Sequence, residues 1–357
     1  MNNLRIPSVT VLTTVYNGLP HLEEAIDSTL NQTYSNFKYL IIDDASPDKD
    51  VVPFIQQYKD DRIHLIVNEK NLGVSKTFNK ALGIIDTEFL IRLDQDDISL
   101  PNRIEELMGF FQANTKVSVA CSWEHTIDSE GKRIRDWTRE ISNYGDFISP
   151  VLLGICPIWH PSIAFRTESL KEAGGFDHSY IRAEDFEVTA RLAMKRYEAG
   201  ICRKFLVLQR EHDNRQSIQF DSIQTETTSR IQKECIEQFL PNEGSDLISR
   251  FLLLKVDIGF FDKHKVIEIS KQLNNMESNM KKELNLSISE FISIEKNFTR
   301  RIGYGLKFLN YYRFLPSIFF IMIFYLLSPT HIKNLRLTVS ATLNFLMELK
   351  YKLKEYK

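Results

Sequence analysis

Apolar and polar positions follow two alternating patterns along the first half of the chain. Short apolar runs that fit buried strands occupy residues 8–14, 37–42, 63–67, 88–93 and 117–123. Between these runs, apolar residues recur every three or four positions, which predicts helices over residues 21–30, 53–58, 74–82 and 101–111. Strands that alternate with helices of this length predict right-handed βαβ units and a mostly parallel sheet.

The second half of the chain changes character. A helix is expected at residues 183–195 and a strand at 201–210, and helical patterns dominate from about residue 221. We therefore expect an α/β domain over residues 1–217, with halves at about 1–100 and 101–217, and a helical region over 218–357. The length of 357 residues and the apolar share of 43% suit a large domain with an extension.

Polar side chains gather where four of the predicted strands end. They occur at residues 14–17, 43–44, 68–71 and 94–97. The carboxyl ends of parallel strands meet at one edge of a sheet, and ligands bind there. Four separate clusters at one edge therefore predict a binding site.

The cluster after the fourth strand is the most informative, because Asp94, Asp96 and Asp97 place three carboxylates within four positions. Crowded carboxylates repel each other and lose hydration. Mg²⁺ or Mn²⁺ relieves both costs and completes its shell with water and substrate phosphates. Taken alone, the segment also fits a solvated acidic turn before the next helix.

Other sequence features exclude several classes of protein. No P-loop or G-x-G-x-x-G follows the first strand, which argues against an ATPase or a dinucleotide-dependent dehydrogenase. The four cysteines stand far apart without a C-x-x-C pair, which argues against zinc or thioredoxin-like chemistry and favours a reduced compartment. Residues 1–7 lack the apolar core of a signal peptide.

The charge of the chain is uneven. The formal net charge is −2, yet residues 300–357 carry ten basic and two acidic side chains, a local charge of +8. An apolar run at residues 314–327 is too short to span a bilayer, and basic and tyrosine side chains flank it. We expect this segment, near residues 311–327, to lie at the inner face of the cell membrane, with a buried core helix as the alternative.

The polar clusters and later motifs together resemble a known family. In order they are Val15-Tyr16-Asn17, Asp43-Asp44-Ala45-Ser46, Asn71-Leu72-Gly73 with Asn79, Asp94-Gln95-Asp96-Asp97, Gly174-Gly175-Phe176-Asp177, Ala183-Glu184-Asp185 and Arg210-Glu211-His212. Each motif is weak alone, but the ordered set resembles the family-2 inverting glycosyltransferases of GT-A fold over residues 6–217. Ala45 stands where the family usually has Gly, and Thr14 where it often has Pro.

The resemblance implies a pocket for a nucleoside-diphosphate sugar, most simply a UDP-sugar. Thr14, Tyr16 and Asn17 would line the pocket, with Tyr16 as an aromatic face for the base. Asp43 and Asp44 would contact the base and ribose, and Lys76 would approach a phosphate. The local alternatives are packing of the tyrosine, an Asx turn at the acids and a solvated lysine.

The same resemblance assigns the chemistry. Asp96 would bind Mn²⁺ or Mg²⁺ directly, Asp94 would bind the metal or the ribose, and His212 would complete the metal shell. Asp185 would be the general base that takes the proton of the acceptor hydroxyl. Glu184 and Trp159 would contact the acceptor. The alternatives are that Glu184 and Asp185 only complement the dipole at the start of their helix and that Trp159 belongs to the protein core.

The sequence therefore predicts a cytoplasmic, membrane-associated transferase for cell-surface polysaccharide synthesis, acting on a glycan or lipid-linked glycan. Nucleic acid is not an expected partner, and the aromatic-rich C-terminal region is compatible with a homodimer. A sugar-nucleotide pyrophosphorylase and a non-catalytic nucleotide- or glycan-binding protein are the alternatives. The first would normally carry a Gly-rich, basic phosphate loop after strand one, which Tyr16-Asn17-Gly18 does not supply.

Overall fold

The computed structural model describes residues 9–211, 221–240, 243–252 and 263–308. Two compact units divide the chain, one formed by residues 1–147 and 156–228, the other by 148–155 and 229–357. His212 and the expected interfacial segment at 311–327 lie outside the described residues.

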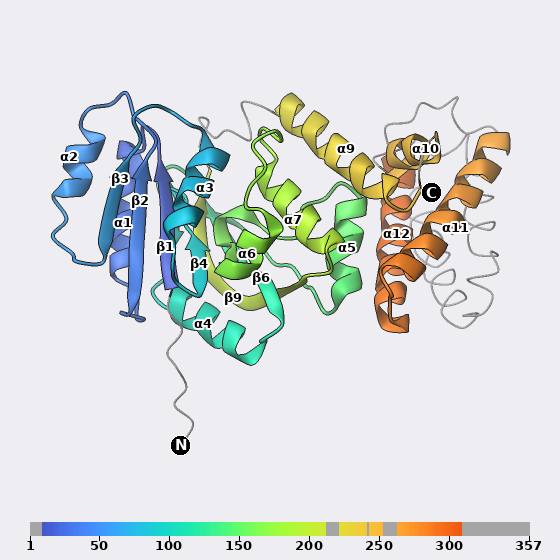
Figure 1. The fold of residues 1–357 in the computed structure, drawn as a ribbon, viewed down its shortest axis with the longest axis horizontal. Helices are drawn as coiled ribbons and strands as arrows, with labels where there is room; N and C mark the ends of the chain where they lie inside the picture. The colour runs from blue at the N-terminus through green and yellow to red at the C-terminus, as the bar shows by residue number, and fades with distance from the viewer. Residues whose placement is uncertain (1–8, 212–220, 241–242, 253–262, 309–357) are drawn as a thin grey trace, which may run out of the picture. The chain divides into compact units, whose positions relative to one another are not determined.

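The first unit contains a sheet whose nine strands follow the order β3-β2-β1-β4-β8-β6-β9-β5, with β7 paired to β6. The strands are β1 (Val9–Val15), β2 (Phe37–Asp43), β3 (Ile63–Val67), β4 (Phe89–Arg92), β5 (Ile98–Ser99), β6 (Val117–Ile127), β7 (Arg133–Trp137), β8 (Ala164–Arg166) and β9 (Glu198–Arg210). Strands β3, β2, β1 and β4 are mutually parallel, as predicted, and stand side by side in Figure 1. Beyond β4 the sheet is mixed. Strand β8 is antiparallel to its two neighbours, β4 and β6, whereas β6 is parallel to β9.

The helices of this part of the chain connect the strands. They are α1 (Leu19–Leu30), α2 (Val51–Gln56), α3 (Val74–Ile84), α4 (Arg103–Ala113), α5 (Tyr144–Leu152), the short 3₁₀ helix η1 (His160–Ser162), α6 (Thr167–Ala173) and α7 (Glu184–Met194). The sequence pattern did not reveal β5, β7, α5 or α6. Strand β5 has two residues and all five residues of β7 are exposed, so neither leaves an apolar alternation to read.

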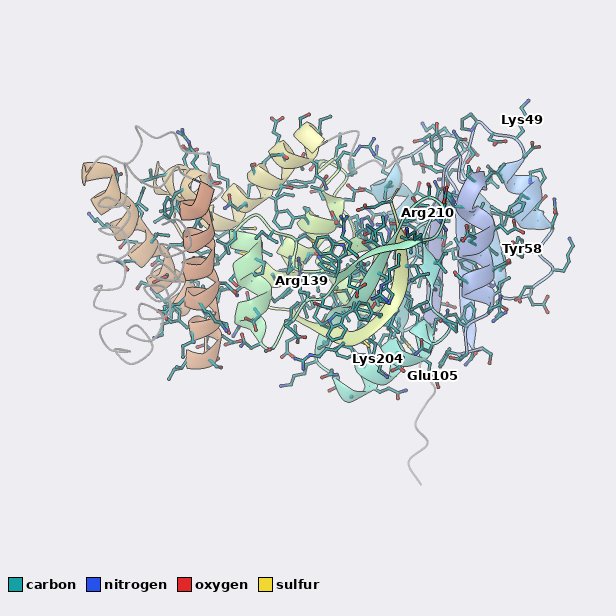
Figure 2. All side chains as sticks on the ribbon, turned by 180° about the vertical axis from the view of Figure 1, so that it is seen from behind. Lys49, Tyr58, Glu105, Arg139, Lys204 and Arg210 are labelled. Atoms are coloured by element: carbon teal, nitrogen blue, oxygen red, sulfur yellow. The ribbon has the colours of Figure 1, made fainter. Side chains whose placement is uncertain are left out.

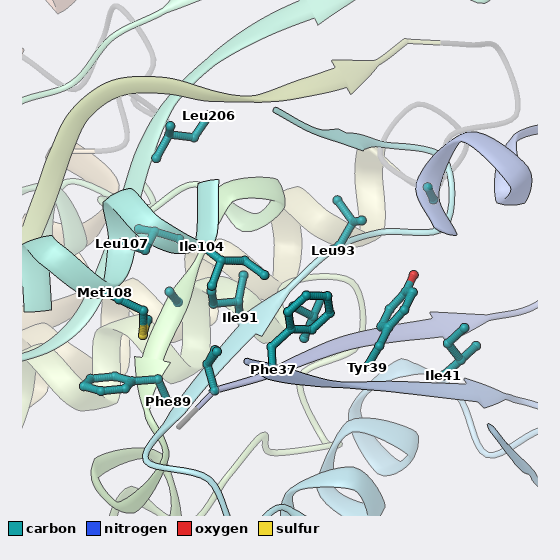
Figure 3. Close-up of a cluster of buried hydrophobic side chains, with 14 of the residues drawn as sticks. Phe37, Tyr39, Ile41, Phe89, Ile91, Leu93, Ile104, Leu107, Met108 and Leu206 are labelled. Atoms are coloured by element: carbon teal, nitrogen blue, oxygen red, sulfur yellow. The ribbon is translucent and has the colours of Figure 1, made fainter. Parts of the chain in front are cut away.

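The core on one face of the sheet follows from the period of two along the strands. Alternate residues of β1, β2 and β4 pack against α1 and α4. Figure 3 shows the part of this layer that β2, β4 and α4 form. The side chains that form this layer include Val9, Val11, Leu22, Ile26, Phe37, Tyr39, Phe89, Ile91, Ile104, Leu107 and Phe111. This packing fixes the strand ends that carry the polar clusters.

On the opposite face, an asparagine of α3 holds the Gly174–Asp177 turn. The Asn79 side chain accepts a hydrogen bond from the Phe176 N–H at 2.8 Å and donates one to the Phe176 carbonyl at 2.7 Å. The Phe176 ring then packs on Phe78 at 4.7 Å between centroids. A Cβ on Gly175 would lie 2.4 Å from the Asn79 Oδ1, so glycine is required at that position. The turn leads into the loop that places α7.

The second unit is helical. It contains α10 (Glu243–Leu252), α11 (Lys263–Glu283), α12 (Ile288–Phe308), the last part of α9 (Asp221–Glu237) and residues 148–152 of α5. Its core includes Ile236, Ile248, Leu273, Met276, Ile294 and Phe298. Within the part of the chain that the structure describes, no helix is long and apolar enough to cross a membrane.

Candidate active site

Backbone hydrogen bonds bring the polar strand ends together at the carboxyl edge of the parallel strands. The Asp44 N–H donates to the Val15 carbonyl at 2.8 Å, and the Asn68 N–H donates to the Asp43 carbonyl at 2.8 Å. Strand β4 continues this edge into the loop that carries the three carboxylates of residues 94–97. The clusters after β1, β2, β3 and β4 are thus neighbours in the structure.

The loop after β1 presents an aromatic ring at this edge. Tyr16 is 45% exposed and Thr14 is half-buried. Asn17 has a left-handed φ of 55°, and its N–H donates to the Ser46 Oγ at 2.9 Å. The Gln95 Oε1 accepts from the Tyr16 N–H at 2.8 Å. The exposed ring therefore stands on a backbone held by both the β2 loop and the acidic loop.

The two acids after β2 have different protein partners. Asp43 accepts from the Ser46 Oγ at 2.5 Å and from the Ser46 N–H at 3.2 Å, which closes an Asx turn. Asp44 accepts from the Asn68 Nδ2 at 2.7 Å and from the N–H groups of Leu72 and Gly73 at 2.9 and 2.8 Å. Both oxygens of Asp44 thus hold the loop before α3. That loop presents the first turn of α3, where Lys76 is exposed.

The acidic loop after β4 is anchored by buried arginines. The Arg92 Nε donates to one oxygen of Asp94 at 2.7 Å, and Asp94 keeps 26% of its side chain exposed. The Asp97 Oδ1 accepts from the Arg210 N–H at 2.9 Å, and Asp97 is only 3% exposed. Asp96 is half-buried. Asp97 is therefore a structural acid, whereas Asp94 and Asp96 remain partly accessible.

Arg210 ties three elements to this loop, and Figure 2 shows it between α1 and the sheet. Its side chain is buried, its Nη2 donates to Glu24 of α1 at 2.9 Å, and its Nε donates to the Asp96 carbonyl at 3.2 Å. Its Nη1 donates to carbonyls of the β6–β7 turn. The sequence pattern did not assign this structural role to Arg210, because β9 carries several charged residues and nothing marks this one as buried.

The N-terminus of α7 places two more acids near the acidic loop. Asp185 keeps 21% of its side chain exposed, and Glu184 is 9% exposed. Burial raises the pKa of the Asp185 carboxyl, although the Phe186 N–H bond and the positive charge of Arg92 oppose the shift. Burial likewise raises the pKa of Glu184, and Arg92 again opposes. A raised pKa suits a carboxylate that must accept a proton.

Arg92 therefore interacts with acids from two elements. Its guanidinium binds Asp94, packs over the Phe78 ring at 5.1 Å and acts electrostatically on both Glu184 and Asp185. Its Nη1 is buried without a hydrogen-bond partner among the described residues. The sequence feature that could have pointed to this role is the position of Arg92, a charged residue at the end of the apolar strand β4.

A histidine adjoins the candidate base. The His160 Nδ1 lies 3.7 Å from the Asp185 Oδ2, and its Nε2 is buried without a hydrogen-bond partner among the described residues. Trp159, the preceding residue, is half-buried. The Arg139 guanidinium lies over the Trp159 ring at 4.9 Å. The sequence-predicted acceptor residues Trp159, Glu184 and Asp185 are thus linked through η1 and α7.

The donor atoms offered by the acidic loop suit a hard cation, because Asp94 and Asp96 supply only oxygen ligands. Among the described residues, no three His, Cys, Asp or Glu side chains gather where they could hold a metal ion by themselves. An incomplete protein cage is typical of Mg²⁺ sites, where water and substrate phosphates supply the remaining ligands. The free thiols Cys121, Cys156, Cys202 and Cys235 do not form disulfides.

Known proteins resemble this chain in sequence and fold. The chain is 30% identical over 204 residues to an uncharacterized glycosyltransferase of Methanocaldococcus jannaschii, a match that covers 56% of this chain and 70% of the relative. It is 28% identical over 251 residues to one from Haemophilus influenzae, covering 68% and 77%. EpsE of Bacillus subtilis, named as a glycosyltransferase, is 32% identical over 173 residues, covering 48% and 60%.

Among solved structures, S. aureus TarS in complex with UDP-GlcNAc shares the fold with a TM-score of 0.51 at 16% identity, covering 84% of this chain and 81% of that one. The family model described as glycosyl transferase family 2 matches residues 10–174. Together with the motif order and the sheet, these likenesses establish that the chain is an enzyme of glycosyl transferase family 2.

Proposed function

We propose that the enzyme transfers a sugar from a UDP-sugar to a hydroxyl group of a glycan or lipid-linked glycan, with inversion at the anomeric carbon. The observation that carries this proposal is the position of Arg92. It binds Asp94 of the acidic loop and acts electrostatically on Asp185 and Glu184 of α7. Donor-side and acceptor-side carboxylates therefore belong to one site.

The donor pocket lies at the strand edge. The exposed Tyr16 ring offers a face for the base, with Thr14 and Asn17 beside it. We assign contacts with the base N3–H and the ribose to Asp43 and Asp44. An ionised carboxylate has about four acceptor sites, and protein donors use two at Asp43 and three at Asp44. The exposed Lys76 supplies a positive charge for a phosphate. Structures of TarS with UDP and with UDP-GlcNAc support this class of donor.

Asp96 and Asp94 would hold Mn²⁺ or Mg²⁺, and His212 would add a ligand. The cation would neutralise charge that develops on the departing diphosphate. Arg92 orients Asp94 through its 2.7 Å bond, so one oxygen of Asp94 is fixed by the protein. The other residues of the site would orient the donor and remove the proton of the acceptor hydroxyl.

Asp185 acts as the general base. As the acceptor hydroxyl attacks the anomeric carbon, its proton moves to the Asp185 carboxylate and the bond from that carbon to the diphosphate breaks. The Phe186 N–H fixes the Asp185 Oδ1 at 2.8 Å, and the Oδ2 is the oxygen nearer His160. Glu184 orients the acceptor. A base opposite the leaving group gives inversion.

The cellular setting in this proposal is the cytoplasmic face of the membrane, where cell-surface polysaccharide is assembled. Residues 311–327 and the +8 charge of residues 300–357 would hold the enzyme near a lipid-linked acceptor. Replacement of Lys350, Lys352, Lys354 and Lys357 by Gln should weaken co-sedimentation with anionic vesicles but leave the weak binding to neutral vesicles unchanged. Equal sedimentation of both proteins on anionic vesicles would contradict the membrane assignment.

Calorimetry of nucleotide binding tests the donor site. UDP, GDP and dTDP are titrated with and without Mn²⁺ into the wild type, Asp96→Ala and the control Asp61→Ala, whose side chain is exposed before β3. We expect metal-dependent binding of UDP that disappears only in Asp96→Ala. Absence of binding by any nucleotide, or equal binding by Asp96→Ala, would overturn the proposed donor site.

A further inference from the structure

Two tryptophans form an aromatic surface in the first unit. Trp137 ends β7 and is 39% exposed, and Trp159 precedes η1. Their ring centroids lie 5.1 Å apart with an interplanar angle of 84°. Among the described strands β7 pairs with β6 alone, and all of its residues are exposed. A large aromatic ring is thus held at the surface on a strand that also exposes Ile134 among polar side chains.

One hydrogen bond and one cation fix the Trp137 ring. Its indole N–H donates to the Thr126 Oγ1 at 3.0 Å, and the Arg135 guanidinium lies over the ring at 5.0 Å. Arg139 lies over Trp159 in the same way. A ring held at its N–H and covered by a cation on one side has little rotational freedom to lose when a ligand contacts it.

The charges around the two rings are mostly compensated. Arg135 pairs with Glu211, and Arg133 pairs with Asp136, which also contacts the His125 ring. Arg139 is largely buried, and burial lowers the pKa of its guanidinium. Because Arg133 and Arg135 already have carboxylate partners, this surface favours an uncharged ligand with an apolar face over a phosphate.

The surface is continuous with the candidate base. Trp159 is followed directly by His160, whose Nδ1 lies 3.7 Å from the Asp185 Oδ2. The chain of contacts therefore runs from Trp137 through Trp159 and His160 to Asp185. A sugar ring placed on the tryptophans would belong to the molecule whose hydroxyl reaches Asp185.

We propose that Trp137, together with Trp159, forms a stacking platform for a neutral pyranose ring of the acceptor. The proposal rests on the proposed transferase function and assigns Trp137 to binding of the acceptor rather than the donor. The apolar C–H face of a pyranose would pack on the indole, as apolar groups do on aromatic surfaces. The site would select the acceptor by its ring and leave donor binding unaffected.

The three tryptophans allow a test that needs no knowledge of the natural acceptor. The full chain is labelled with 5-fluorotryptophan, and the fluorine resonances are assigned with Trp→Phe variants. Methyl β-glucoside, methyl β-galactoside and methyl N-acetyl-β-glucosaminide are titrated with and without UDP and Mn²⁺. Trp123 is the internal control, because its ring packs on Phe205 and its N–H donates to the Arg139 carbonyl.

We expect a saturable change at Trp137 and Trp159 with at least one sugar and no change at Trp123. Trp137→Ala should weaken that sugar's effect on Trp159 by about tenfold, and Trp137→Phe should retain part of it. No saturable change at Trp137 with any of the sugars overturns the platform. A response to inorganic phosphate in place of sugar overturns it as well.

UDP titration of the same samples separates the two proposals. UDP binding without a sugar response at Trp137 rejects the platform but leaves the proposed function standing. A sugar response without UDP binding rejects the donor assignment and leaves the platform as a glycan-binding surface.

Discussion

The Gln95 side chain holds the Tyr16 backbone at both of its polar groups. Its Oε1 accepts from the Tyr16 N–H at 2.8 Å, and its Nε2 donates to the Tyr16 carbonyl at 3.2 Å. A residue inside the acidic loop therefore fixes the loop that presents the aromatic ring. A Cβ on Gly18 would lie 2.5 Å from the Gln95 Oε1, so the absence of a side chain at Gly18 is part of the arrangement.

Loss of this double hydrogen bond should weaken nucleotide binding. Gln95→Leu removes both bonds, and Gly18→Ala displaces the Gln95 carboxamide without removing a polar group. We expect each variant to lower the free energy of unfolding by about 1–2 kcal/mol and to weaken UDP binding. Urea unfolding and calorimetry measure the two effects.

The double variant provides the control for this prediction. Because Gly18→Ala acts through Gln95, the two effects should be less than additive. Gln112→Leu, on the exposed face of α4, should change stability by less than about 0.5 kcal/mol. Full additivity of Gln95→Leu and Gly18→Ala would show that the two residues act independently.

Asp185→Asn should remove transfer and stabilise the folded protein. Asparagine retains an oxygen that can accept from the Phe186 N–H but carries no charge to bury. Because burial raises the folded-state pKa of Asp185, its ionised form destabilises the fold. This cost is absent below the unfolded pKa of about 4. It grows as the pH rises through the raised folded pKa, and is complete above it.

The stabilisation by Asp185→Asn is therefore expected at neutral pH and should vanish in acid. Transfer should fall by at least about 10²-fold, the usual minimum for loss of a general base. Thermal unfolding between acidic and neutral pH and UDP release from UDP-sugars measure the two effects. Wild-type rates of transfer in Asp185→Asn would exclude this residue as the base.

Arg210→Met should be among the most destabilising single changes at the site. It leaves Glu24 without its 2.9 Å partner and removes the donors to the carbonyls of residues 96, 128 and 129. Loss of one partner of a buried ion pair typically costs about 3–5 kcal/mol. Because Glu24 is half-exposed and water screens its charge, we expect the loss in the free energy of unfolding to be about 3 kcal/mol.

Glu24→Gln is the matched control for Arg210→Met. It keeps a hydrogen-bond acceptor for Arg210 at a position that is 51% exposed, so its cost should stay below about 1 kcal/mol. Chemical unfolding of both variants gives the comparison. Equal costs would mean that the ion pair, and not the carbonyl contacts of Arg210, dominates.

Ala45→Gly should stabilise the protein. Ala45 has a left-handed φ of 57°, a conformation that costs an alanine about 1 kcal/mol more than a glycine. We expect a gain of about 0.5–1 kcal/mol in the free energy of unfolding, measured by urea titration. Ala45→Val should destabilise, because a β-branched residue is disfavoured at this φ. Destabilisation by both changes would show that the Ala45 methyl packs usefully.

The first four strands and the helices between them were predictable from the sequence, because each strand is a short run rich in apolar residues and each helix has an apolar face. β3, for example, was predicted at its observed bounds, Ile63–Val67. Later elements were harder to predict. Strand β7 is exposed on every residue, so its existence depends on pairing with β6 and not on local pattern.

The sequence by itself determined the fold class and the residue types at the strand ends, since parallel strands necessarily bring their carboxyl ends to one edge. The tertiary structure decided which carboxylates are held by protein donors. Asp44 and Asp97 bind backbone N–H groups that are 28 or more positions away in sequence, whereas Asp94 and Asp96 remain partly accessible. Local pattern cannot reveal such partners, because hydrogen bonding between distant segments depends on packing of the whole sheet.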